Sequence, residues 1–305
     1  MSEAGPAPLS SPPAVPAPPA RPADAPPARR PAVRAGGGAT AALLPVSPLD
    51  AGPAPRPPGR RARPPDPTTP LCPAVLDLPG PLHRPYVAGP RALRGPLELY
   101  LAEVGAQDER AMLWAQELLD REERARARAF RRARDRDAYV IAHATLRALL
   151  GPLLGVRADE LPLMREPCAG CGAPHGRPAL RAPGLHFSLS HSGDLVLVAL
   201  AGTPVGVDVE GLASAEAVRS AQCALHPAEV AELARLPAYE RQAAFTRTWV
   251  RKEAYLKGLG TGLVRDPALD HVGTGDRPVS PSPRWTLRDV LVPTGYAAAV
   301  ALRRE

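Results

Sequence analysis

The chain is poor in lysine. Of its 38 basic residues, 36 are arginine, and the two lysines, Lys252 and Lys257, both fall within residues 249–257. The abundance of Ala, Pro and Arg suggests GC-rich codons, which would turn most solvated lysines into arginines. Because a lysine ammonium is a compact charge that can shift its pKa and transfer a proton, the pair predicts a chemical centre in this segment. Chance, or an ordinary solvated helix face, would give the same pattern.

Long apolar runs and cysteines are scarce as well. No run approaches the roughly 20 residues of a membrane span, and residues 1–20 lack the basic and apolar regions of a signal peptide. The four cysteines are too few and too scattered for a disulfide framework, which fits a reducing compartment. We therefore expect a cytoplasmic protein with no membrane partner. The cysteines are Cys72, Cys168, Cys171 and Cys223.

Residues 1–95 differ in composition from the rest of the chain. They hold 26 of the 41 prolines, and 11 arginines against 5 acids, whereas residues 96–305 are close to neutral. Such sequence buries too little apolar surface to offset the entropy of ordering it. We expect a disordered, basic Pro/Ala/Arg-rich arm. It lacks the interleaved aromatic residues that stack on bases, so no specific nucleic-acid binding is expected.

From residue 96 on, apolar periodicity predicts strands and helices in a repeated order. Order should begin near Pro96, and residues 156–183 should form a loop. The predicted strands cover 97–104, 185–190, 195–200, 205–210, 285–292 and 295–302. The predicted helices cover 112–119, 124–150 (ended by Gly151-Pro152), a segment beginning at Pro227, and 239–257. This order predicts an α+β fold of two similar halves, 96–203 and 204–305.

Two carboxylates alternate along one predicted strand. In residues 205–210 the strand period of two places Asp208 and Glu210 on one face and the valines on the other. Adjacent carboxylates repel each other unless a cation lies between them, and oxygen ligands of this kind suit magnesium. A strand with one solvated face is the alternative.

A second group lies on the predicted helix 239–257. Trp249, Glu253 and Lys257 are spaced four residues apart, so they share one face. If this face meets the strand carboxylates, Glu253 becomes a metal ligand or general base and Lys257 a phosphate contact, a set suited to phosphoryl transfer. A modest surface salt bridge between Glu253 and Lys257 is the alternative.

Residues 187–193 carry an imidazole and hydroxyls at a strand end. His191 beside Ser190 is either a general base or an anion ligand, and we favour the anion role. No Gly-x-Ser-x-Gly motif is present, which argues against a serine hydrolase. Cys168, Cys171 and His175 look like part of a zinc site, but a structural zinc wants four ligands. A loop with inert thiols is the simpler interpretation.

Three segments, residues 187–192 (FSLSHS), 206–210 (GVDVE) and 249–258 (WVRKEAYLKG), resemble in order and spacing the signature motifs of the 4'-phosphopantetheinyl transferase superfamily, in its larger Sfp-like branch. The similarity covers residues 96–305. It implies two pseudo-symmetric α+β halves, with coenzyme A and magnesium in the cleft between them. It also implies transfer of 4'-phosphopantetheine from coenzyme A to a serine of an acyl or peptidyl carrier protein, with release of 3',5'-ADP.

The resemblance also implies roles for individual residues. It makes Asp208, Glu210 and Glu253 the magnesium ligands, and Glu253 and Lys257 the catalytic residues. The implied coenzyme A contacts are Arg136, Arg147, Arg177, Pro178, Ser190, His191 and Lys257. Arginines at the cleft mouth would suit an acidic carrier helix, and a duplicated chain can complete its cleft as a monomer. A non-enzymatic interaction protein with a degenerate coenzyme A site is the alternative, although every charged motif position is filled.

Overall fold

The structure is a computed structural model that describes residues 69–76, 92–168, 172–174 and 176–305. All of them belong to one compact unit, Ala62–Glu305. Most of the predicted arm, residues 1–68 and 77–91, lies outside the described residues. Within the described ranges, no helix is long and apolar enough to cross a membrane.

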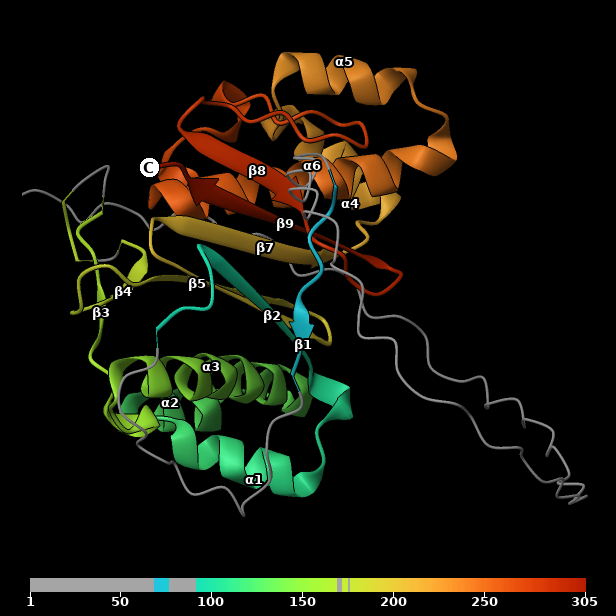
Figure 1. Cartoon of the computed structure of the whole chain (residues 1–305). Helices are drawn as coiled ribbons and strands as arrows, with labels where there is room; N and C mark the ends of the chain where they lie inside the picture. Colours follow the sequence, from blue (N-terminus) through green and yellow to red (C-terminus); the bar gives the residue numbers. More distant parts are fainter. Residues whose placement is uncertain (1–68, 77–91, 169–171, 175) are drawn as a thin grey trace, which may run out of the picture. The chain divides into compact units, whose positions relative to one another are not determined.

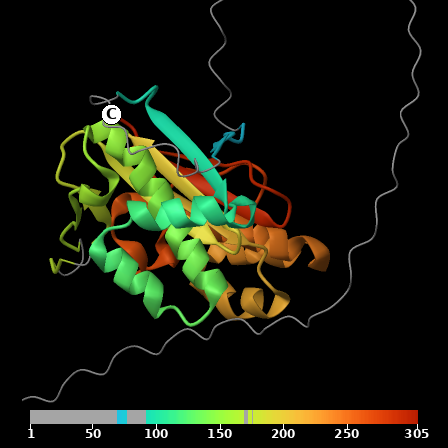
Figure 2. The same ribbon diagram turned by 90° about the horizontal axis from the view of Figure 1, so that it is seen from below.

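The first part of the unit packs three helices on a mixed sheet whose strand order is β1-β2-β6-β5. β2 and β5 each pair antiparallel with β6, and β1 adds parallel to β2. Figure 1 draws the helices on one side of this sheet, and Figure 2 shows them from below. The strands are β1 (Ala74–Val75), β2 (Leu97–Glu103), β5 (His186–Ser192) and β6 (Leu195–Ala201), and the helices are α1 (Glu109–Leu118), α2 (Arg121–Ala129) and α3 (Ala133–Leu154).

The second part has three helices and a three-stranded antiparallel sheet of order β7-β9-β8. In each sheet the strand that precedes the helices lies at one side of a later antiparallel hairpin and pairs with that hairpin's second strand. The strands are β7 (Val205–Gly211), β8 (Trp285–Asp289) and β9 (Tyr296–Arg303), and the helices are α4 (Ala215–Ala221), α5 (Pro227–Arg235) and α6 (Ala238–Leu259). The expected α+β class is confirmed.

β6 explains how the layers stack, because all seven of its residues are buried. Val196, Val198 and Leu200 face the core formed with α1–α3. The alternate residues, including Leu197, face the second sheet. A strand buried on both faces reads as a continuous apolar run rather than an alternating one, as predicted for this segment. The second sheet in turn packs its far face on α6.

Several predictions about the elements are wrong. Ordered structure does not begin at Pro96, because β1 and Leu71, within the predicted arm, pair with the sheets. The single helix over 124–150 is two helices: the backbone is extended at Phe130, whose ring packs on Tyr139. Pro152 does not end α3. The helix runs on to Gly155, whose left-handed φ of 66° provides the cap.

The predicted loop 156–183 also contains regular structure. A short antiparallel hairpin is formed by β3 (Leu163–Arg165) and β4 (Pro178–Leu180). Gly176 lies in the loop that joins the two strands, where an added Cβ would come within 2.4 Å of the Glu166 carbonyl oxygen. Only glycine fits this close approach of two backbones. The hairpin forms one wall of the larger cavity described below.

Candidate functional site

An acidic pocket of about 280 Å³ opens where β5, β7 and α6 meet. We name it for its three carboxylates, Asp208 and Glu210 from β7 and Glu253 from α6. The strand period and the four-residue helix spacing bring the predicted groups to one place. The lining residues are Leu189, Ser190, His191, Asp208, Glu210, Trp249, Glu253 and Lys257.

Serine hydroxyls join the two sheets beside this pocket. Each of three alternate serines on β5 accepts a hydrogen bond from a backbone N–H of β7: Ser188 from Val207, Ser190 from Val209 and Ser192 from Gly211. Two of the same hydroxyls donate to the carboxylates, Ser190 to Asp208 at 2.8 Å and Ser192 to Glu210 at 2.7 Å. The alternating serines therefore fix the positions of both strand acids.

Lys257 is the cation of the acidic pocket. Its Nζ lies 2.6 Å from Oδ1 of Asp208 and 3.0 Å from the Ser190 hydroxyl oxygen. The Asp208 side chain is almost completely buried, whereas 32% of the Lys257 side chain is exposed. The ammonium is thus anchored at one end of the cavity while its other side remains open to a ligand.

Burial raises the pKa of all three carboxylates in the pocket. For Asp208, desolvation outweighs the opposing effect of Lys257 and Ser190. Desolvation also dominates for Glu210 and Glu253, and the charge of Asp208 raises both pKa values further. Three acids facing one ammonium leave an excess of negative charge that an additional cation would relieve.

The carboxylate oxygens of this pocket are suitable magnesium ligands, although their side chains do not converge on one point. Asp208 Oδ2 is buried without a hydrogen-bond partner, which leaves one carboxylate oxygen for a cation. Magnesium prefers oxygen ligands such as carboxylates and usually keeps several bound waters, which an open pocket allows. As they stand, no three acidic, histidine or cysteine side chains among the described residues converge closely enough to hold a metal. Side-chain movement, including release of Asp208 by Lys257, would be needed to complete a site.

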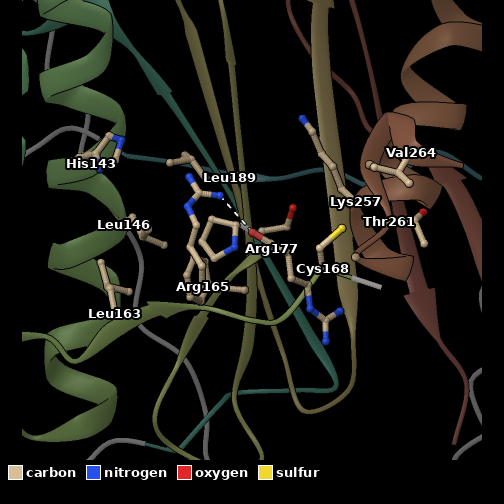
Figure 3. A pocket seen from close by; sticks show the side chains of 16 residues that line it. His143, Leu146, Leu163, Arg165, Cys168, Arg177, Leu189, Lys257, Thr261 and Val264 are labelled. Carbon is tan, nitrogen blue, oxygen red and sulfur yellow. Dashed lines mark hydrogen bonds between the residues drawn. The ribbon is translucent and has the colours of Figure 1, made fainter. Parts of the chain in front are cut away.

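A larger, basic pocket of about 370 Å³ adjoins the acidic one, because Leu189 and Lys257 line both. We name it for the side chains of His143, Arg165, Arg177 and Lys257; among the described residues that line it, none is acidic. Figure 3 shows His143 and Leu146 entering from α3 on one side, and Lys257 and Thr261 from the end of α6 on the other. The Thr261 hydroxyl is buried without a partner. This arrangement favours an anionic ligand.

The predicted coenzyme A contacts fall into two groups. Arg177, Pro178, Ser190, His191 and Lys257 line one or both pockets. Arg136 and Arg147 line neither. Arg136 is exposed and pairs with its neighbour Asp137 at 2.9 Å.

Arg147 is the clearest departure from expectation, because its side chain is fully buried. Its guanidinium pairs with Asp120 and Glu123 and donates to the carbonyl oxygen of Ala158. The guanidinium is thus enclosed by protein groups, which favours a structural role, and its predicted contact with coenzyme A stays a prediction. Arg147 joins α2 to α3.

His143 is a pocket residue that sequence reasoning missed. Its Nδ1 lies 2.8 Å from Glu123, the partner of Arg147, and its ring packs on Tyr139 at a centroid distance of 4.1 Å. A signal was present, since His143 is the one imidazole of α3 and lies in its mainly apolar second half. Arg165, which donates to the Gly176 carbonyl oxygen, was also missed, because the segment that carries it was predicted as a loop.

Two further expectations concern the lysine pair and the cysteines. Only Lys257 lies in the site, because Lys252 is buried in an ion pair with Glu229 at 2.8 Å. Of the partial zinc motif, Cys168 is buried and lines the basic pocket. Cys171 and His175 lie outside the described residues, so the zinc hypothesis stays untested.

Comparison with known proteins supports the motif assignments. Residues 204–300 match the model of the 4'-phosphopantetheinyl transferase superfamily. The chain is 32% identical over 192 residues to the 4'-phosphopantetheinyl transferase HetI of a Nostoc species, a match that covers 60% of this chain and 78% of HetI. It is 32% identical over 148 residues to the 4'-phosphopantetheinyl transferase psf-1 of Bacillus pumilus, which covers 47% of this chain and 58% of that relative.

Proposed function

Because the chain belongs to the 4'-phosphopantetheinyl transferase superfamily and is an enzyme of that class, we propose that it moves 4'-phosphopantetheine from coenzyme A to a serine of a carrier protein. The observation that carries this proposal is the pair of adjoining pockets, one acidic and one basic, which share Lys257. A diphosphate lying across the junction would meet Lys257 and the acids on one side, with the rest of the nucleotide in the basic pocket.

The acidic pocket is the proposed place of chemistry. We assign Asp208, Glu210 and Glu253 as ligands for magnesium, which when bound would neutralise diphosphate charge. The unpartnered Oδ2 of Asp208 and the raised pKa of each acid support this assignment.

In the proposed reaction, the carrier serine oxygen attacks the β-phosphorus of coenzyme A. A new P–O bond forms as the bond between that phosphorus and the oxygen bridging to the α-phosphate breaks. Glu253 takes the serine proton as the general base. In this proposal Lys257 neutralises the charge that develops on the departing 3',5'-ADP.

The basic pocket is the proposed nucleotide site. His143 and Arg165 supply positive or hydrogen-bonding groups, and Pro178 and Leu189 supply apolar walls. Ser190 and His191, which line the acidic pocket, are kept as phosphate contacts. The predicted coenzyme A contacts Arg136 and Arg147 line neither pocket and carry no step of this proposal. Arg136 is exposed, and Arg147 is enclosed by its ion pairs.

Several broader expectations belong to the same proposal. The similar strand orders of the two sheets support an origin as two pseudo-symmetric halves, 96–203 and 204–305. We propose a cytoplasmic monomer that acts on acyl or peptidyl carrier domains and has no specific nucleic-acid partner. Arginines on α2 and at the start of α3, which are mostly exposed, provide a basic surface for an acidic carrier helix.

The test is a mass measurement on carrier proteins. Wild-type protein, coenzyme A and magnesium are incubated with several apo carrier domains, and each carrier is expected to gain one phosphopantetheine. Carriers whose acceptor serine is replaced by alanine are the control. The proposal fails if the wild-type protein modifies none of the carriers while a known transferase modifies them all.

A further inference from the structure

Arg177 connects two parts of the site that are far apart in the sequence. It lies in the loop of the β3–β4 hairpin, directly before β4, where its guanidinium forms a two-pronged ion pair with Glu166, with distances of 2.7 and 3.1 Å. The remaining arm donates to the carbonyl oxygen of Gly258, in the last turn of α6, at 2.8 Å. One side chain therefore ties the hairpin to the end of the helix that carries Lys257.

The geometry of the Arg177 side chain favours strong hydrogen bonds to both of its partners. Arginine presents its donors in a rigid fork that matches a carboxylate, and such pairs are stronger than single hydrogen bonds. Carbonyls in the last turn of a helix lack partners within the helix, and a cation there also interacts favourably with the helix dipole. The Arg177 side chain is only 20% exposed, which limits screening by water.

The connection ends directly beside the reactive lysine. Gly258 follows Lys257 in the chain, and Gly260 caps the helix in a left-handed conformation with φ of 77°. A Cβ on Gly260 would lie 3.4 Å from Cδ of Arg177, so the arginine stem also packs against this cap. The next residues, Thr261 and Gly262, line the basic pocket. A shift of the helix end would move both Lys257 and the pocket wall.

We propose that Arg177 and Glu166 form a clamp that positions Lys257 and the α6 end of the basic pocket, so that Arg177 acts as a positioning residue rather than chiefly as a ligand contact. The inference rests on the proposed function for its kinetic test. The clamp predicts that loss of Glu166 lowers turnover as much as loss of Arg177 does, although Glu166 lines neither pocket. A direct contact between Arg177 and the nucleotide predicts the opposite, since loss of Glu166 would then free the guanidinium for the ligand.

The experiment compares Glu166→Ala, Arg177→Gln and the double variant in steady-state carrier loading. Misplacement of a catalytic group by about 1 Å can lower a rate on the order of a hundredfold, so we expect each single variant to lower kcat by ten- to a hundredfold. The double variant should be no worse than the more severe single one, because both remove the same clamp. Arg157→Gln is the matched control, since Arg157 forms an ion pair with Asp159 on an exposed surface away from the pockets.

Three outcomes would overturn the clamp. The first is an unchanged kcat in Glu166→Ala together with a raised KM for coenzyme A in Arg177→Gln. The second is full additivity of the two changes. The third is a lower melting temperature with an unchanged kcat in the folded fraction, which would indicate a merely structural pair.

A second measurement separates the clamp from the proposed function. The amides of Gly260 and Thr261 donate to carbonyls in the last turn of α6, and their hydrogen exchange reports on that turn without any substrate. Both clamp variants should speed this exchange at least severalfold relative to Arg157→Gln, and unchanged exchange would overturn the clamp. If exchange rises but the wild-type protein modifies no carrier, the clamp stands and the proposed function fails.

Discussion

Gly206 of β7 and Gly258 of α6 bring strand and helix into backbone contact. A Cβ built on Gly206 would lie 2.3 Å from the Gly258 nitrogen and 2.0 Å from the Ala254 carbonyl oxygen. Real Cβ contacts do not come this close, so neither element leaves room for a side chain here. This approach brings the end of α6 onto β7, where Lys257 reaches Asp208 two residues beyond Gly206.

Gly206→Ala should therefore destabilise the fold and disturb the acidic pocket together. Overpacking of a close contact typically costs about 1 to 3 kcal/mol, and here the obstructing atoms are backbone, which cannot rotate away. Urea denaturation measures the change in the free energy of unfolding. Gly202→Ala is the control, because a Cβ there meets nothing within 4 Å. Equal stability of the two variants would contradict the argument.

The two lysines should respond differently to the same substitution. Lys252 is buried against Glu229 and donates to the carbonyl oxygens of Pro267 and Asp270. Lys252→Met would leave a buried carboxylate uncompensated, which costs about 3 to 5 kcal/mol. Lys257→Met should cost less stability, because 32% of the Lys257 side chain is already exposed and the Ser190 hydroxyl still donates to Asp208. It should lower kcat by about a hundredfold or more.

Unfolding curves and carrier loading, measured on both lysine variants, check this contrast. Each variant serves as the control for the other, because both lysines lie on α6 and the substitution is identical. A stable Lys252→Met protein with wild-type unfolding, or a Lys257→Met protein that retains full turnover, would contradict the assignment of one lysine to structure and the other to chemistry.

The fold was largely predictable from apolar periodicity, whereas the links between its parts were not. β6 and β7 were placed within about one residue, because a continuous apolar run and a strict alternation each indicate one kind of strand. β1 has only two residues and forms through pairing with β2, so no local sequence pattern predicts it. The break between α2 and α3 depends on packing of Phe130 against Tyr139, a contact between residues nine apart.

The acidic pocket was more predictable than the basic one for a similar reason. Asp208, Glu210, Glu253 and Lys257 follow strand and helix periods, which the sequence displays directly. The position of Arg147 depends on its ion pairs with Asp120 and Glu123. These are contacts between different helices, which sequence periodicity does not predict. With many arginines in one segment, residue type alone could not separate a structural arginine from a ligand contact.

The segment Thr69–Leu76 should stabilise the unit, because its backbone forms hydrogen bonds with both sheets. Leu71 exchanges backbone hydrogen bonds with Asp289 and Leu291, and β1 pairs with β2. We expect a chain beginning at Ala62 to melt like the full chain and a chain beginning at Leu93 to melt lower. A loss of about 2 kcal/mol would shift the midpoint by about 4 to 8 °C. Equal melting temperatures of the two truncated chains would contradict this role.

Glu123 should make stability depend on pH in the acid range. Burial opposes its ionisation, but hydrogen bonds from His143 and Arg147 outweigh that effect and lower the pKa from 4.5 to about 2. A carboxyl whose pKa is lower in the folded state stabilises the fold above its unfolded pKa. That contribution is lost as the pH falls from about 4.5 towards 2, and its size is on the order of 3 kcal/mol.

Glu123→Gln tests this dependence, because glutamine keeps the shape of the side chain and removes its titration. The free energy of unfolding, measured by urea denaturation from pH 6 down to pH 2.5, should fall less steeply in this variant than in the wild-type protein. Glu122→Gln is the matched control, since Glu122 is the exposed neighbour on the same helix, and it should follow the wild-type slope. If Glu123→Gln also follows that slope, the carboxylate does not hold α2 and α3 together through its charge.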